Sequence, residues 1–229
     1  MKNAHSVQAL RVLRQTDWLA GFSPDLAALL LDAGRLVRLA PGAWAQAEGD
    51  DRGGLFVVID GLFHSFCRAP GDRLVMIGTS GAGAVLGHAT RFSGGPRLVT
   101  AVCAEPSTVL EISETALERV AEQRPEIWRA IAGFAYNNMR SALQFAAEVI
   151  ALPPRQRIAA RLLAAAAASD AEPPEIHLTQ QLLGETLGLT RKTVNSHLTA
   201  FERAGLITLG YGKIILNDTI KLQAIAQMC

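Results

Sequence analysis

A run of polar side chains near the C-terminus has the composition of a nucleic-acid contact. The run spans residues 191–199 and lies within LTQQLLGETLGLTRKTVNSHLTAFERAGLI, residues 178–207. Residues 191–199 include no acidic side chain. The members of the run can donate hydrogen bonds to phosphates and to acceptors on base edges. They predict contact with DNA and are Arg191, Lys192, Asn195, Ser196 and Thr199.

Two short helices and a hairpin are needed to position these side chains. Thr179 and Thr190 are candidate N-caps, and Gly188 suits the left-handed turn between the two helices. The following LITLGYGKIIL alternates around Gly-Tyr-Gly, which predicts a β-hairpin wing with Lys213 near its tip. The pattern predicts a winged helix-turn-helix, in which Thr179 and Gln180 meet phosphate and the second helix meets base edges.

The middle of the chain is typical of a β-barrel or sandwich. Between residues 36 and 112, short apolar runs alternate with turn residues every 8–12 positions. GLFVVIDGLFHSF, with Asp60-Gly61 at its centre, predicts a β-hairpin. PDLAALLLDAG, residues 24–34, predicts a short helix before the first strand.

A helical period replaces this pattern from residue 113 to residue 152. Apolar residues recur at alternating intervals of three and four, which is the seam of a coiled coil, and Asn138 is the polar member that can fix its register. The alternative is that this helix packs on its own barrel. Pro153 and Pro154 end the helix. The predicted dimer seam consists of Trp128, Ile131, Ala135, Asn138, Ala142, Phe145, Val149 and Leu152.

Composition excludes some classes and leaves others open. The chain has 229 residues, a formal net charge of +1 and three cysteines. A charge this small does not by itself favour nucleic acid, so the DNA prediction depends on where the polar residues stand. No apolar run is long enough for a membrane span, the N-terminus lacks the apolar core of a signal peptide, and the odd cysteine count favours a reducing compartment. We therefore expect a cytoplasmic protein.

On these motifs the sequence resembles the Crp/Fnr family of transcription regulators over nearly its whole length. GLFVVIDGLF resembles the family's β-roll hairpin, and GLTRKTVNSHL resembles its recognition helix. The resemblance implies an α+β fold. Its parts are an N-terminal β-roll (a jelly-roll-like double-stranded β-helix) in residues 1–124, a dimerisation helix in 125–152 and a winged helix-turn-helix in 153–229. It also implies a dimeric, sequence-specific DNA-binding regulator that is not an enzyme, and leaves contact with RNA polymerase open.

The cassette that binds cyclic nucleotides in this family is incomplete here. The matching stretch is LGHATRFSGGPRLV, in which His88 replaces a glutamate and Leu98 replaces a serine or threonine. We therefore expect an unidentified small-molecule effector other than cyclic AMP, and no bound cofactor. Arg97 remains to meet an anion or to pair with a nearby carboxylate. The effector-pocket candidates are Gly87, His88, Arg97, Leu98, Ala142 and Leu143.

The recognition helix also departs from the family. Arg191 matches the arginine that reads guanine, but Lys192 stands where a glutamate commonly accepts from cytosine. A lysine cannot accept a hydrogen bond, so the operator should differ from the usual half-site.

Three alternatives remain beside a DNA-binding regulator with an organic effector. The first is a haem or redox sensor, with His64, Cys67, His88 and Cys103 as candidate ligands or thiols. The second is a cyclic-nucleotide-binding module without DNA contact. The third is an enzyme on a cupin-like barrel, which would need clustered metal ligands. The five histidines are too dispersed for such a cluster, so we expect no metal site and no catalytic residues.

Overall fold

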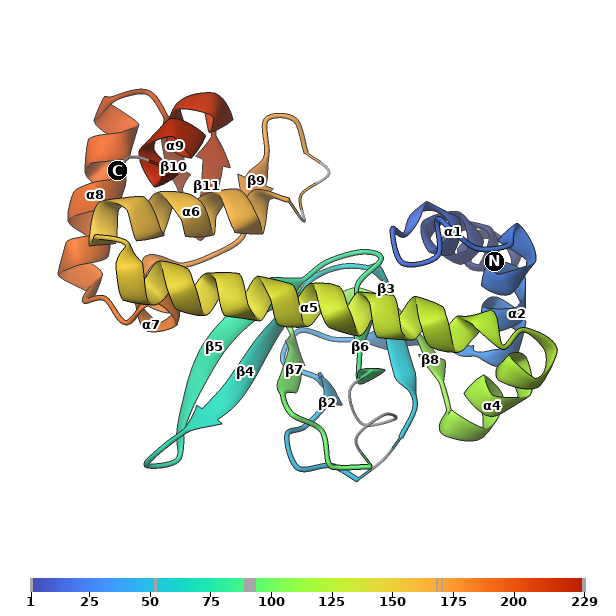
Figure 1. Cartoon of the computed structure of the whole chain (residues 1–229). Helices are drawn as coiled ribbons and strands as arrows, with labels where there is room; N and C mark the ends of the chain where they lie inside the picture. Colours follow the sequence, from blue (N-terminus) through green and yellow to red (C-terminus); the bar gives the residue numbers. More distant parts are fainter. Residues whose placement is uncertain (1, 52, 89–93, 168, 170, 228–229) are drawn as a thin grey trace. The chain divides into compact units, whose positions relative to one another are not determined.

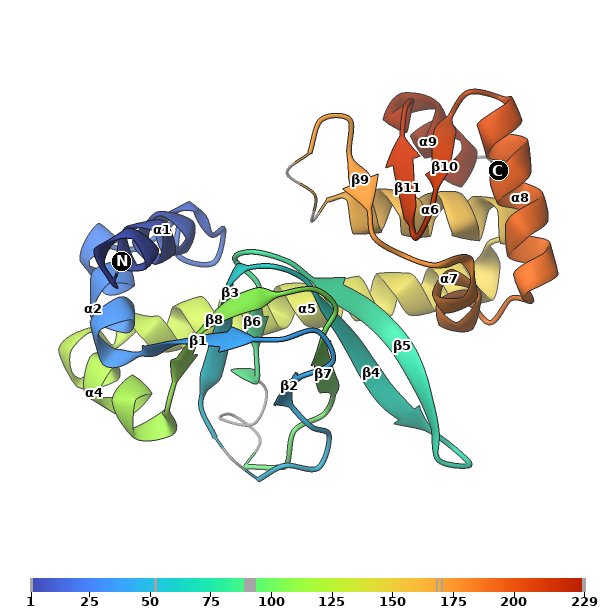
Figure 2. The same cartoon turned by 180° about the vertical axis from the view of Figure 1, so that it is seen from behind.

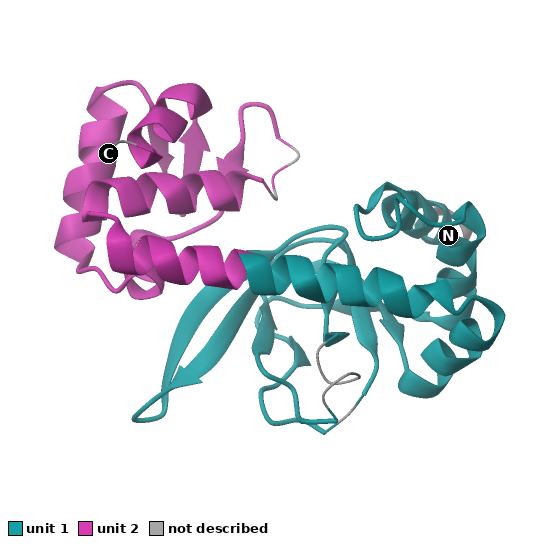
Figure 3. Ribbon diagram, viewed as in Figure 1, with its two compact units in different colours: residues 1–140 teal, residues 141–229 magenta. Residues whose placement is uncertain are grey.

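The computed structural model describes residues 2–51, 53–88, 94–167, 169 and 171–227. The chain divides into two compact units, residues 1–140 and 141–229 (Figure 3). The long helix α5, Glu126–Ala151, crosses the division. The predicted α+β fold class is confirmed, since a β-sandwich, a long helix and a helix-turn-helix with a small sheet follow one another along the chain.

Two four-stranded antiparallel sheets form the roll of the first unit (Figure 1). Their strand orders are β1-β8-β3-β6 and β2-β7-β4-β5, and Figure 2 shows them from behind. Eight strands in two sheets are the jelly-roll arrangement. The strands are β1 Arg35–Leu39, β2 Trp44–Gln46, β3 Leu55–Asp60, β4 Phe63–Ala69, β5 Arg73–Ser80, β6 Val85–Leu86, β7 Thr100–Cys103 and β8 Ser107–Ile112.

The turn at Asp60-Gly61 joins the two sheets, so the predicted hairpin is wrong. Both apolar runs are strands, but β3 pairs with β8 and β6, whereas β4 pairs with β5 and β7. Gly61 has a φ of +95°, and a Cβ there would lie 2.1 Å from the Ser107 hydroxyl oxygen. Val57 and Val58 of β3 belong to different core clusters. A strand that is buried on both faces has a continuous apolar sequence. Such a sequence does not show whether the next strand belongs to the same sheet.

Helices cover the outer face of the β1-β8-β3-β6 sheet. They are α1 (Lys2–Gln15), α2 (Pro24–Ala33), α4 (Glu114–Gln123) and the first turns of α5. The helix predicted over residues 24–34 is α2, and its N-cap Ser23 accepts from the Asp25 amide at 3.4 Å. Leu13, Leu30 and Ile131 are completely buried in the shared core. The start of α5 is therefore part of the first unit's core.

The second unit is a small helical body with a three-stranded sheet in the order β10-β11-β9. The hairpin β10–β11 is the predicted wing, while the short strand β9 and the last helix α9 were not predicted. Pro154 starts the first helix, three residues after α5 ends. The elements are α6 Pro154–Ala166, β9 Glu175–Ile176, α7 Gln180–Leu187, α8 Arg191–Arg203, β10 Ile207–Gly210, β11 Lys213–Leu216 and α9 Thr219–Ala226.

Within the described part of the chain, none of the helices has both the length and the apolar content that a bilayer crossing requires.

Candidate functional site

Caps and a left-handed glycine set the angle between α7 and α8. Thr179 caps α7 by accepting from the Leu182 amide at 3.2 Å, and Thr190 caps α8 by accepting from the Thr193 amide at 3.1 Å. Gly188 between them has φ +64° and ψ +31°, where a side chain would be strained. The two threonines and the glycine that predicted this helix-turn-helix therefore act as its caps and its turn.

The N-terminal face of α8 is open to solvent and has no acidic side chain in its first turn. Its inner face is buried through Val194, Leu198 and Phe201. The helix N-terminus adds partial positive charge to that of the arginine and the lysine. Four of the predicted contact residues are exposed and the fifth is half-buried, and they are Arg191, Lys192, Asn195, Ser196 and Thr199.

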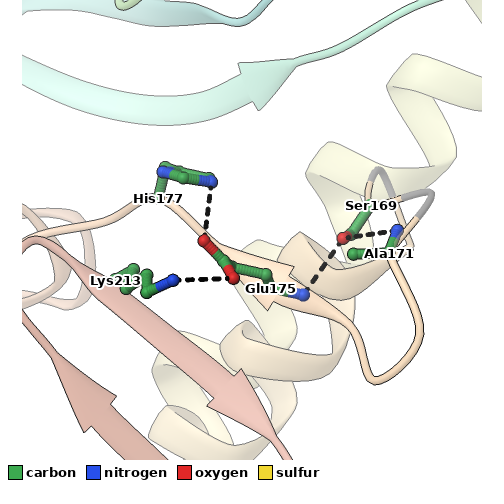
Figure 4. A network of polar contacts seen from close by, with 5 residues as sticks. All are labelled: Ser169, Ala171, Glu175, His177 and Lys213. Carbon is green, nitrogen blue, oxygen red and sulfur yellow. Dashed lines mark hydrogen bonds and ion pairs between the residues drawn. The ribbon is translucent and has the colours of Figure 1, made fainter.

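The wing is held by an ion pair that sequence reasoning missed, and a histidine contacts the same carboxylate. Lys213 Nζ lies 3.0 Å from Glu175 Oε2, and His177 Nε2 lies 3.2 Å from Glu175 Oε1 (Figure 4). Lys213, predicted to contact DNA, is thus engaged by β9 within its own unit. Tyr211 is fully exposed in the turn between the two wing strands. Because β9 is only two residues long, no local pattern predicted its pairing with the wing.

A second missed residue is Arg157 of α6. Its guanidinium donates from Nε and Nη2 to the Leu152 carbonyl, at 3.3 and 3.0 Å, and from Nη1 to the Leu187 carbonyl at 3.0 Å. These carbonyls stand at the ends of α5 and α7, where helix carbonyls lack partners in their own helix. Arg157 therefore ties the end of α5 to the helix-turn-helix.

The predicted seam on α5 is partly buried and partly exposed, since Asn138 and Ala142 are open to solvent while other members pack against their own unit. Trp128 and Ile131 pack in the core of the first unit, and Ile131 has no exposed surface. In the second unit, Phe145 packs under the Arg161 guanidinium at 5.1 Å. A different stripe, one residue further along, is exposed and apolar at intervals of three and four. It consists of Ala132, Tyr136, Met139, Leu143, Ala146 and Ile150.

Two members of the effector cassette, Gly87 and Arg97, meet in the structure. A Cβ on Gly87 would lie 1.7 Å from Arg97 Nη1, and Gly87 has φ +85°. Arg97 is 3% exposed, and its guanidinium carbon lies 5.8 Å from the centre of the Phe56 ring. Among the described residues, Arg97 Nη1 has no hydrogen-bond partner. Burial lowers the pKa of Arg97, while the charges of Asp50 and Glu114 raise it.

His88 faces α5. Its ring lies edge-on to Phe134 at 5.0 Å between centroids, and its Nε2 lies 3.4 Å from Asn138 Nδ2. Burial lowers the pKa of His88; a backbone hydrogen bond with Val85 opposes this shift and the charge of Arg97 adds to it. His88 is thus favoured in its neutral form.

The remaining effector-pocket candidates are exposed. Leu98 is 63% exposed, and its carbonyl accepts from Cys67 Sγ at 3.5 Å. Ala142 and Leu143 are exposed on the part of α5 that belongs to the second unit.

A cavity of about 270 Å³ opens between the two sheets beside Arg97. Its walls come from β1, β2, β3 and β8 and from the loops that carry Asp50 and Arg97. The lining residues are Val37, Leu39, Trp44, Ala45, Gln46, Asp50, Gly53, Phe56, Arg97, Val109 and Glu111.

The cysteine and histidine candidates do not assemble. Burial, and next the charge of Glu48, raise the pKa of Cys67, which opposes formation of a reactive thiolate. Cys103 is buried, with its Sγ 2.8 Å from the Glu105 carbonyl oxygen. Among the residues that the structure describes, no three His, Cys, Asp or Glu side chains gather to hold a metal ion. Cys229 lies outside the described residues.

Comparison with known proteins assigns both units. Residues 36–124 match the cyclic nucleotide-binding domain, and residues 156–225 match the Crp-like helix-turn-helix domain. The chain is 27% identical over 202 residues to the nitrogen fixation regulation protein FixK of Bradyrhizobium diazoefficiens, covering 84% of this chain and 82% of FixK. It is 24% identical over 216 residues to the CRP-like cAMP-activated global transcriptional regulator of Mycobacterium tuberculosis, covering 92% and 96%. The FixK2 structure from Bradyrhizobium japonicum has the same fold, with a TM-score of 0.74 at 18% identity, covering 86% and 98%.

A β-roll of the cyclic nucleotide-binding type followed by a winged helix-turn-helix defines a DNA-binding transcription regulator. The chain belongs to the Crp/Fnr family. Its relatives are transcription regulators and not enzymes, which removes the cupin-like enzyme as an alternative.

The contact between Gly87 and Arg97 makes a stability prediction. Gly87→Ala and Gly71→Ala both force a side chain into left-handed backbone, which costs about 1 kcal/mol. Only Gly87→Ala adds a clash, because nothing lies within 4 Å of a Cβ at Gly71. We expect Gly87→Ala to lose a further 1–3 kcal/mol or so in urea unfolding monitored by circular dichroism. Equal losses in the two variants would contradict the close packing of Arg97 on Gly87.

The depressed pKa of His88 makes a pH prediction. As the pH falls below 6.5, the ordinary value, the unfolded chain takes up a proton that folded His88 resists. The stability that the neutral ring contributes should therefore be present above pH 6.5 and decrease below it. His88→Gln should lose less stability than the unmodified chain when urea unfolding at about pH 7.5 is compared with about pH 5.5. An equal loss in both proteins would show that His88 does not contribute.

Proposed function

We propose that the protein is a dimeric, sequence-specific regulator that reads a palindromic DNA site and is controlled through its β-roll. The observation that carries the proposal is the exposed N-terminal face of α8, which has Arg191 and Lys192 in its first turn and no carboxylate. An α-helix fits the major groove of B-DNA, and helix-turn-helix proteins read bases with the first turns of this helix. Thr179 and Gln180, at the start of α7, contact phosphate in this arrangement.

Pairing of two copies through α5 supports the palindromic site. The exposed stripe through Met139 and Leu143 has the three-and-four spacing of a coiled-coil seam, and its large side chains are more than half exposed. The sequence alone placed this interface one residue earlier, where Trp128 and Ile131 are taken up by the first unit's own core. We therefore assign the dimer interface to the exposed stripe.

The effector is a small molecule other than cyclic AMP. One relative is named as cAMP-activated, but here His88 stands in the position of the ribose-binding carboxylate and contacts α5. Leu98 replaces the phosphate-binding hydroxyl. Arg97 is the polar group of the cassette that remains, and it lines the cavity in the roll. A regulator of this kind acts in the cytoplasm, where it can meet RNA polymerase on DNA.

The DNA proposal is tested by selecting operators from randomised duplexes. Arg191→Ala should cost about 1–3 kcal/mol and relax the requirement for one guanine in each half-site. Lys192→Glu should shift the preferred base pair toward cytosine, because an acceptor replaces a donor. Thr179→Ala should weaken all sequences about equally. Half-sites should lie about 34 Å apart. An unchanged preferred sequence in Lys192→Glu would make Lys192 a phosphate contact.

The dimer proposal is tested by placing charge in the exposed stripe. The double variant Met139→Glu, Leu143→Glu should be a folded monomer in light scattering and should lose specific DNA binding, because buried like charges oppose pairing. Asn137→Glu, on the same helix outside the stripe, is the matched control and should remain dimeric. A monomeric unmodified chain at micromolar concentration would exclude this interface.

Calorimetry tests the exclusion of cyclic AMP. We expect no heat of binding at micromolar nucleotide, because the carboxylate and the hydroxyl of the cassette are both replaced. Restoring them with His88→Glu and Leu98→Ser should not by itself create binding, since Ala142 and Leu143 supply no hydroxyl from α5. Micromolar binding by the unmodified chain would show that the missing groups are not needed.

A further inference from the structure

The cavity in the roll has apolar side chains along one wall and polar groups over much of the rest. Val37 and Leu39 of β1, Phe56 of β3 and Val109 of β8 all line it from one sheet. Trp44 of β2 lines it from the other sheet and is 62% exposed, so this side of the cavity reaches solvent. None of the described lining residues comes from α5. A ligand here would lie inside the roll and be held by the two sheets.

Two buried polar atoms of lining residues lack partners in the described structure. Arg97 is 3% exposed and its Nη1 has no hydrogen-bond partner. Gln46 is 6% exposed; its Nε2 donates to the Val99 carbonyl at 3.0 Å, which leaves Oε1 without a donor. Leaving such groups unsatisfied costs about 1–3 kcal/mol each, and more for a charged group. A ligand that accepts from Arg97 and donates to Gln46 would recover this energy.

The charges near the cavity disfavour a ligand that carries more than one negative charge. Arg97 is a cation that burial disfavours, as the lowered pKa of its guanidinium reflects. Two carboxylates, Asp50 and Glu111, also line the cavity, and Glu111 is paired outward with Arg35 at 2.6 Å. Asp50 and Glu111 would repel a dianion such as a phosphate monoester more strongly than a monoanion. A monocarboxylate matches one guanidinium and forms strong charge-assisted hydrogen bonds with it.

The cavity is also connected to α5 by direct contacts. Arg97 Nη1 packs against Gly87, and the next residue, His88, contacts Phe134 and Asn138 of α5. All these residues belong to the first unit. A ligand that draws the Arg97 guanidinium into the cavity therefore changes the packing beside the helix on which the dimer proposal depends.

We propose that the cavity between the two sheets binds a small apolar monocarboxylic acid that also carries a hydroxyl group. The carboxylate pairs with Arg97, the hydroxyl donates to Gln46 Oε1, and the hydrocarbon part lies against Val37, Phe56 and Val109. The inference rests on the proposed sensor function of the roll and names the class of ligand that it takes.

Isothermal calorimetry on the full chain tests this assignment with three probes. They are 3-hydroxyhexanoate, hexanoate, which lacks the hydroxyl, and 3-hydroxyhexanamide, which lacks the charge. We expect 3-hydroxyhexanoate to bind with a Kd of about 1 mM or tighter, and each of the other probes about tenfold more weakly. Equal affinity for the acid and the amide, or no heat with any probe at several times about 1 mM, would overturn the proposal.

Variants locate the probe in the cavity. Arg97→Met should abolish the preference for the acid over the amide, while Arg73→Met, which removes an exposed arginine of β5, should keep it. Gln46→Leu should abolish the preference for 3-hydroxyhexanoate over hexanoate. The probe should change the tryptophan fluorescence of the unmodified chain, and Trp44→Phe should remove this change while heat is still released. If Arg97→Met fails to fold, the comparison of acid with amide in the unmodified chain still decides the question.

Operator selection without any probe separates this inference from the proposed function. If specific DNA is selected but the acid and the amide bind alike, the ligand assignment is wrong and the regulator remains. If the acid binds as expected but no DNA sequence is selected, the site is correct and the proposed DNA readout is wrong.

Discussion

The burial of one face of α5 determines which of its other faces meet His88 and which are exposed. Ile127, Ala130 and Ile131 are buried among α1, α2, α4 and the β1-β8-β3-β6 sheet. Burial contributes about 1.5–3 kcal/mol of stability for each isoleucine. A helix fixed in this way cannot turn a different face outward. The burial determines that Phe134 and Asn138 meet His88, and that Met139 lies on the exposed stripe.

The same constraint brings the roll and the helix into one continuous set of contacts. Arg97 lies in the wall of the cavity, Gly87 accepts its close approach because it has no side chain, and His88 carries the contact to α5. In family members with a complete cassette, a carboxylate would occupy the position of His88. Here a half-buried imidazole, whose neutral form burial favours, packs against Phe134.

The DNA-binding unit depends much less on distant contacts. Two threonine caps, a left-handed glycine and an apolar inner face define α7 and α8 from within about 25 residues. The rest of the unit attaches these two helices to α5 and to the wing. Arg157 joins the last carbonyls of α5 and α7, Glu202 accepts from the Leu209 amide of the wing at 2.9 Å, and β9 supplies Glu175 to Lys213. These bonds connect α7 to the end of α5, and α8 and β9 to the wing.

The sequence by itself determined the fold class, the order of the roll, the long helix and the helix-turn-helix, and the exposed polar face of α8. Caps, glycine turns and periods of 2 and 3.6 act over short distances. The sequence also singled out Gly87 and Arg97, which the structure brings into contact. Only the tertiary structure decided that the Asp60-Gly61 turn changes sheets, that α5 exposes the stripe beside the expected seam, and that Lys213 is paired with Glu175. Each of these depends on partners far away in the chain. A shift of one residue rotates a helix by about 100°, and the two apolar stripes of α5 lie side by side in the sequence, so only the packing of the core distinguishes them.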